Sequence, residues 1–72
     1  MKRYFVNKDP KSNPNYNHEM HTPGCYWGDQ VPEDRRIELG YFPSEIEALV
    51  VAKKYYSDAD GCKDCCPLAH HG

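Results

Sequence analysis

Two short pairs of metal-binding side chains stand far apart in this sequence of 72 residues. The first pair is His21 and Cys25, with three residues between them, and the second is Cys62 and Cys65, with two. Three thiols and one imidazole are the ligands that close a tetrahedral zinc site. Each pair is short enough for both side chains to reach one ion. The sequence therefore predicts one zinc ion that joins the two ends of the domain.

Three further residues compete for a place in this ligand set. Cys66 competes with Cys65, because adjacent residues rarely bind one ion together in good geometry. His70 competes with His21, since it follows Cys66 at the spacing of a ligand pair. His18 replaces His21 if the strand register differs, because the two histidines face opposite sides of an extended segment. An unused Cys66 is either a small buried hydrophobic side chain or a reactive thiol.

The small size of the chain indicates why a metal would matter. A domain of this length buries roughly 60% of the surface that its unfolded chain exposes, so its core is marginal. The longest run of branched aliphatic residues is 49–51, and much of the apolar content is aromatic, with six Tyr, two Phe and one Trp. We therefore expect a disulfide, a metal or a partner chain to add stability.

The start of the chain does not resemble a signal peptide. Only three apolar residues follow Met1, Lys2 and Arg3 before the next polar residue, and a signal peptide needs about 7–15. No stretch approaches the roughly 20 apolar residues that span a bilayer. We therefore expect a cytoplasmic protein that does not enter a membrane. In that reducing compartment, four cysteines favour metal binding or catalysis over a disulfide framework.

The elements that must position the ligands predict an α+β fold with a small antiparallel sheet of about three short strands. Residues with the composition or alternation of strands occupy 4–7, 19–21 and 36–42. In the last segment, Ile37 and Leu39 share one face, and Tyr41 continues it. A turn at 22–24 follows the second segment and lets His21 and Cys25 point at one spot.

One helix is expected in the second half of the chain, followed by a cysteine knuckle. Ser44 is a good N-cap, and Glu47 completes a capping box three residues later. The helix should end near Ser57. Its expected buried stripe follows helical spacing and comprises Ala48, Leu49, Ala52, Tyr55 and Tyr56, widened by Ile46 and Val50. A zinc ion would then tie the sheet to the helix.

We expect residues 1–72 to form a single zinc-binding domain with two flexible segments. The first, 8–17, is polar and contains Pro10 and Pro14, which is turn chemistry. The second is the C-terminal tail, 68–72. No internal repeat or low-complexity tract is present.

These residues resemble the Ada-type metal-binding domain, a small zinc domain found in a bacterial DNA alkylation-repair protein. The matching motifs are His21-x3-Cys25, the helix start Phe-Pro-Ser-Glu-Ile-Glu-Ala at 42–48, and Gly-Cys-x2-Cys-Cys-Pro at 61–67. The resemblance covers roughly residues 18–67. It implies one zinc ion held by His21, Cys25, Cys62 and Cys65. The first ligand of the repair protein is Cys, so only the metal ligands carry over, and methyl transfer does not.

A closed ligand set without a neighbouring general base predicts a non-catalytic zinc module that binds a partner. Tyr16, Tyr26 and Trp27 are the candidate contact surface. The sequence leaves the partner unknown, and a protein or a nucleic acid is the kind considered. A hydrolase or deaminase is disfavoured, because His18-Glu19-Met20-His21 lacks the spacing of their zinc motifs.

Two other functions remain as alternatives. The first is a thiol redox or metal-sensing protein that uses Cys62, Cys65 and Cys66, since a Cys-x-x-Cys motif lowers a thiol pKa. Such redox motifs usually open a helix, however, and this one follows a helix. The second is an accessory module that binds nucleic acid. The formal charge of −2, from 9 basic and 11 acidic residues, disfavours it.

Overall fold

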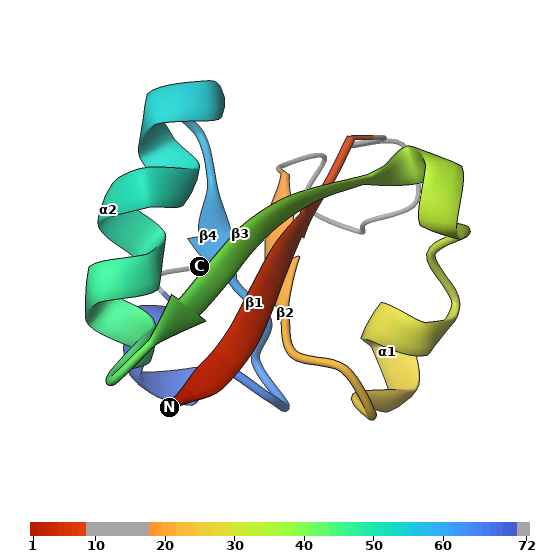
Figure 1. Cartoon of the computed structure of the whole chain (residues 1–72), viewed down its shortest axis with the longest axis horizontal. Helices are drawn as coiled ribbons and strands as arrows, with labels where there is room; N and C mark the ends of the chain where they lie inside the picture. The colour runs from red at the N-terminus through yellow and green to blue at the C-terminus, as the bar shows by residue number, and fades with distance from the viewer. Residues whose placement is uncertain (9–17, 71–72) are drawn as a thin grey trace.

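A four-stranded mixed sheet forms the centre of the computed structural model, which describes residues 1–8 and 18–70. Its strands are β1 (Lys2–Asn7), β2 (Glu19–His21), β3 (Arg36–Phe42) and β4 (Asp60–Gly61). They lie in the order β3-β1-β2-β4 (Figure 1). The predicted α+β class is confirmed. The sheet differs from the expected three antiparallel strands, because β4 adds a fourth strand that runs parallel to β2.

One main helix, α2 (Glu45–Tyr55), accompanies the sheet, together with the short helix α1 (Tyr26–Asp29) and the 3-10 turns η2 (Glu33–Arg35) and η3 (Pro67–Ala69). Ser44 caps α2 as predicted, because its Oγ accepts a hydrogen bond from the backbone N–H of Glu47 at 3.3 Å. Within the described ranges, no helix is long and apolar enough to cross a lipid bilayer.

The central strand β1 is buried on both of its faces. Tyr4 and Val6 belong to the main core, which packs against α2, whereas Phe5 points to the opposite face. Figure 1 shows α2 and α1 on opposite sides of the sheet. The main core comprises Tyr4, Val6, Met20, Ala48, Leu49, Ala52, Ala59, Cys66 and Ala69. The face towards α1 therefore carries a second, smaller packed region.

The buried stripe of α2 is narrower than predicted. Its buried residues are Ala48, Leu49 and Ala52, and Tyr56 beyond its end packs partly buried against the core. The helix packs on the core through these three side chains, and in the described part of the chain no second layer covers its flanks. The prediction that Ile46, Val50 and Tyr55 belong to the buried stripe is therefore wrong, because all three are about half exposed.

A β-bulge in β3 changes which side chains face the core. The register against β1 shifts where Leu39 and Gly40 lie, and Gly40 has φ of 100°, a value that favours glycine. Beyond the shift, Phe42 packs against the core and Tyr41 is 65% exposed. The prediction that Tyr41 continues the face of Ile37 is therefore wrong, because the bulge reverses which side chains of β3 face the core and which face solvent.

The end of the described chain is packed against the fold. Ala69, in η3, is fully buried, and the Nδ1 atom of His70 lies 3.0 Å from the carbonyl oxygen of Gly61. Ala69 and His70 thus lie against the fold, and the flexibility expected of residues 68–72 stays a prediction. Lys8 also has a contact, since its backbone N–H donates to the carbonyl of Arg35 at 2.8 Å. The rest of the two segments expected to be flexible, 9–17 and 71–72, lies outside the described residues.

Candidate metal centre

A tight turn between β2 and α1 positions the first ligand pair. His21 is the last residue of β2, and Cys25 is the N-cap residue of α1. The backbone N–H of Cys25 donates to the carbonyl of Thr22 at 3.2 Å, and Gly24 takes a φ of 89°. The chain thus reverses within four residues, as the sequence predicts, and both side chains point to the same side.

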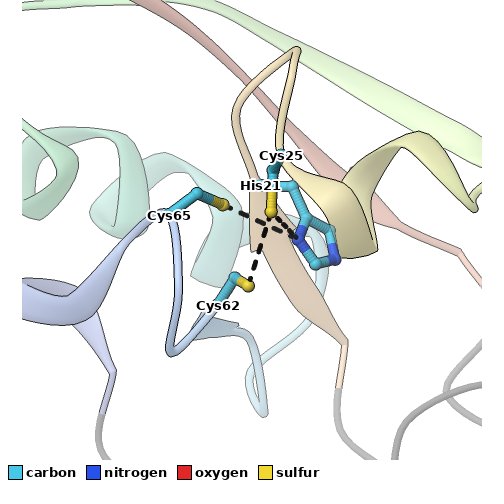
Figure 2. A group of neighbouring side chains, drawn as sticks. All are labelled: His21, Cys25, Cys62 and Cys65. Carbon is cyan, nitrogen blue, oxygen red and sulfur yellow. Dashed lines mark hydrogen bonds between the residues drawn. The ribbon is translucent and has the colours of Figure 1, made fainter.

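The second ligand pair is positioned by the parallel pairing of β4 with β2. Met20 lies opposite Gly61, so the next residues along each strand, His21 and Cys62, are neighbours. The backbone N–H of Cys62 donates to the carbonyl of Met20 at 2.9 Å and extends this register. The turn that follows brings Cys65 back towards the same point (Figure 2).

Four potential ligand atoms converge where the two pairs meet, as Figure 2 shows. The Nδ1 atom of His21 lies 3.8 Å from the Sγ atoms of both Cys25 and Cys65, and the Sγ atoms of Cys25 and Cys62 are 3.8 Å apart. All four atoms lie within 4.8 Å of one another. A regular tetrahedron with Zn–S bonds of about 2.3 Å has S–S edges of about 3.8 Å. The cluster could therefore hold one metal ion.

The four cysteines of the chain are free thiols, and none forms a disulfide. A disulfide requires a sulfur–sulfur distance of about 2.05 Å, and the Sγ atoms of Cys25 and Cys62 are much farther apart. The sulfur separation therefore excludes a bonded pair and matches the edge of a metal–thiolate site.

Burial keeps the imidazole of the cluster neutral. The side chain of His21 is 1% exposed, and this desolvation, followed by the charge of Arg36, lowers its pKa to about 4. A neutral imidazole offers a lone pair to a metal, whereas an imidazolium does not. At neutral pH, His21 is therefore ready to bind a cation without losing a proton.

The three thiols, unlike the imidazole, have raised pKa values and must lose a proton before they can bind a metal. Burial raises the pKa of Cys62 to about 12 and also raises that of Cys25. The pKa of Cys65 is raised first by its hydrogen bond with the Cys66 thiol and then by burial. Without a cation, these groups hold their protons at neutral pH, because burial disfavours thiolates. A bound cation would displace those protons.

Backbone N–H groups already point at the sulfur atoms. The N–H of Thr22 donates to the Sγ of Cys65 at 3.4 Å. The N–H groups of Cys65 and Asp64 donate to the Cys62 thiol, and they lower its pKa against the larger effect of burial. Donors in these positions stabilise thiolates and orient metal ligands. The turn after β4 thus has the features of the predicted knuckle.

The three alternate ligands lie elsewhere. The Cys66 side chain is fully buried in the main core, the small hydrophobic role that the sequence allowed for it. The His70 ring lies against Gly61, and the Nδ1 atom of His18 lies 2.7 Å from a carboxylate oxygen of Asp58. In the part of the chain that the structure describes, none of these three residues belongs to the cluster.

Close packing behind His21 is a feature that the sequence did not predict. A Cβ atom added to Gly28 in α1 would lie 2.8 Å from the Cβ of His21 and 3.1 Å from the Phe5 ring, so only glycine fits there. The Phe5 ring lies 5.7 Å from the His21 ring, and the Arg36 guanidinium lies 4.3 Å above the Phe5 ring. The one signal for this packing in the sequence was Gly28 itself, three residues after Cys25. A single glycine does not specify which side chain packs against it.

The aromatic residues of α1 stand at the surface beside the cluster. Tyr26 and Trp27 are 69% and 53% exposed and form an edge-to-face pair. The indole N–H of Trp27 donates to the carboxylate of Asp64, which lies between the second pair of ligands in the chain. Tyr16, the third predicted surface aromatic, lies outside the described residues.

No protein-family model, curated protein or solved structure matches this chain. The resemblance to the Ada-type domain is thus without support from a matching family. The findings support the coarser statement that this is a small α+β domain whose one imidazole and three thiols could hold a metal ion.

Proposed function

We propose that this chain is a small zinc-binding domain, in which one zinc ion is bound by the Nδ1 atom of His21 and the Sγ atoms of Cys25, Cys62 and Cys65. The observation that carries the proposal is the convergence of these four atoms within 4.8 Å of one another. Soft thiolates with one imidazole suit zinc better than calcium or magnesium, which prefer oxygen ligands.

The ion serves a structural role in this proposal. Four protein ligands fill a tetrahedral site and leave no position for a reacting water, so the site is non-catalytic. Phe5 and Val31 are buried on the α1 side of the sheet, outside the main core. A zinc ion there would join β2 and α1 to the turn after β4, which compensates for the small amount of apolar packing. All of residues 1–72 would form this one domain.

The domain would use its exposed aromatic side chains to bind a partner. The ligand Cys25 immediately precedes Tyr26 and Trp27, and Asp64 holds the Trp27 indole, so zinc would fix the aromatic pair in place. Aromatic side chains are enriched in protein interfaces, which favours a protein partner. A nucleic acid is less well supported, because the chain has 11 acidic and 9 basic residues and a net charge of −2.

A thiol redox or metal-sensing function has less support than a structural one. Reactive cysteines have lowered thiol pKa values and partial exposure. Here the pKa values of Cys25, Cys62 and Cys65 are raised, and Cys66 is buried in the core. A reducing compartment such as the cytoplasm would keep these thiols available for zinc.

Cobalt substitution tests the proposed ligand set. Reconstitution of the reduced protein with Co²⁺ should give the intense visible bands of a tetrahedral ion and thiolate charge-transfer absorption. The charge-transfer absorption should be lost in Cys65→Ser, because this variant lacks one of the four proposed ligands and should no longer bind the ion stoichiometrically, and should remain unchanged in Cys66→Ser. Weak octahedral bands, or equal losses in both variants, would contradict the proposal.

A further inference from the structure

The His21 ring lies between the ligand cluster and a carboxylate. Its Nδ1 atom faces Cys25 and Cys65, whereas its Nε2 atom lies 3.6 Å from an Oε1 oxygen of Glu19. Glu19 and His21 are two residues apart on β2 and therefore share a face of the strand. The Glu19 side chain is only 16% exposed. The carboxylate is thus held close to the far edge of the ring.

This placement bears on the tautomer of the imidazole. A neutral imidazole carries one proton, so Nδ1 offers a lone pair to a metal only when the proton is on Nε2. Glu19 supplies the one polar contact that the structure records for Nε2 among the described residues. A carboxylate oxygen accepts a proton donor and repels a lone pair, so it favours the tautomer with the proton on Nε2.

Neighbouring groups restrict where the Glu19 carboxylate can go. Asp60 of β4 lies opposite Glu19 in the parallel register and is 6% exposed. The Asp60 carboxylate accepts from the backbone N–H of Gly61 at 3.0 Å and lies 3.5 Å from the Nδ1 atom of His70. Because the two carboxylates repel each other, Asp60 disfavours a position of the Glu19 carboxylate closer to β4.

We propose that Glu19 is a positioning residue for the metal site: in the metal-bound protein its carboxylate accepts a hydrogen bond from the Nε2–H group of His21 and thereby aims the Nδ1 lone pair at the cation. The inference rests on the proposed function, since it assumes that His21 binds zinc through Nδ1. A metal-bound imidazole is more acidic than a free one, so the 3.6 Å contact between Nε2 and Glu19 should close to a hydrogen bond when the ion binds.

The test compares Glu19→Gln with Glu33→Gln, because each removes one negative charge, and Glu33 is exposed and has no contact with His21. Zinc affinity is measured by competition with a chelator of known affinity. We expect a loss of about 10–100-fold in Glu19→Gln, the range found for outer-shell partners, and a change below about threefold in Glu33→Gln. In ¹H–¹⁵N spectra of the zinc-bound protein, the Nε2 proton of His21 should move upfield in Glu19→Gln only.

Four outcomes would overturn the inference. Wild-type affinity in Glu19→Gln with an unmoved Nε2 proton would overturn it and leave the zinc site intact. Equal losses in both variants would reduce the role of Glu19 to its net charge. If Glu19→Gln does not fold, Glu19→Asp keeps the charge but withdraws the carboxylate, and wild-type affinity in that variant would overturn the inference. A wild-type protein that takes up no zinc would instead remove the proposed function as well.

Discussion

The Sγ atoms of Cys25 and Cys62 lie 3.8 Å apart, although 37 positions separate them in the sequence. This distance is about the edge of a tetrahedral zinc–thiolate site. It arises because β4 pairs in parallel with β2, which places Cys62 next to His21 and therefore near the turn that carries Cys25. A cation at this point would crosslink the start of α1 to the turn after β4.

Zinc binding should release three protons per ion near pH 7. Burial keeps His21 neutral, with a pKa of about 4, and raises the pKa of Cys62 to about 12, with the pKa values of Cys25 and Cys65 also raised. Only the thiols must therefore lose protons. Apparent affinity should rise about 1,000-fold per pH unit while three protons are released. Calorimetry in buffers with different ionisation enthalpies measures the number of protons.

The number of protons released on zinc binding near pH 5, again measured by calorimetry, shows whether the metal-free chain stays folded. The folded pKa of His21, about 4, lies below its ordinary value of 6.5. This residue therefore contributes stability above pH 6.5, and that contribution is lost as the pH falls towards 4. A folded metal-free protein releases three protons at pH 5, whereas an unfolded one, with an ordinary His21, releases four. Release of one proton or none near pH 7 would contradict the thiolate ligand set.

Cys65→Ser and Cys66→Ser should have different effects, although the two residues are adjacent. Cys65→Ser removes a proposed ligand and should abolish stoichiometric zinc binding. Cys66→Ser should keep one zinc per chain, because Cys66 lies in the main core. Its cost should appear in the free energy of unfolding, about 1–3 kcal/mol for a hydroxyl buried there. Mass spectrometry under native conditions counts the zinc, and urea unfolding gives the stability. Loss of zinc in Cys66→Ser alone would reverse the assignment.

Gly28→Ala should destabilise the zinc-loaded protein by about 1–3 kcal/mol, the usual cost of overpacking. The added methyl group would lie 2.8 Å from the Cβ of His21, so α1 or the ligand must move. Urea unfolding of the zinc-loaded protein measures the effect, with the exposed Glu33→Ala as the control, expected within about 0.5 kcal/mol. A Gly28→Ala protein as stable as the wild type would show that α1 does not pack closely on His21.

Trp27, the single tryptophan, should report metal binding through its fluorescence. Its indole N–H donates to Asp64, which lies in the knuckle between Cys62 and Cys65. Removal of zinc should release the knuckle and break this contact, so the emission should change along with the loss of metal. Asp64→Asn should reduce the change while keeping the zinc. An emission spectrum that is the same with and without zinc would mean that α1 and the knuckle do not move with the site.

Local sequence patterns predicted the elements that have local causes. The N-cap at Ser44 depends on one side chain and its own helix, and the structure has it. The strand at 36–42 follows from the alternation of polar and apolar residues through Leu39 and also agrees with the structure. The turn between His21 and Cys25 was likewise predictable, because the Pro-Gly pair within it is a local signal.

The features that the sequence did not predict depend on distant parts of the chain. The four residues of α1 include Gly28, which is a poor helix former, and they pack because a glycine fits against His21. The strand β4 has only two residues, so its parallel pairing with β2 leaves no periodic pattern. The position of Glu19 against the His21 ring also requires the completed site.

Metal analysis joined to chelation tests the central claim most directly. The protein is purified under reducing conditions, its zinc content is measured, and its folding is followed by circular dichroism before and after a strong chelator is added. We predict one zinc per chain and loss of the fold on chelation, because structural zinc contributes on the order of 10 kcal/mol to folding. A folded protein that contains no metal and is unaffected by chelator or added zinc would contradict the account.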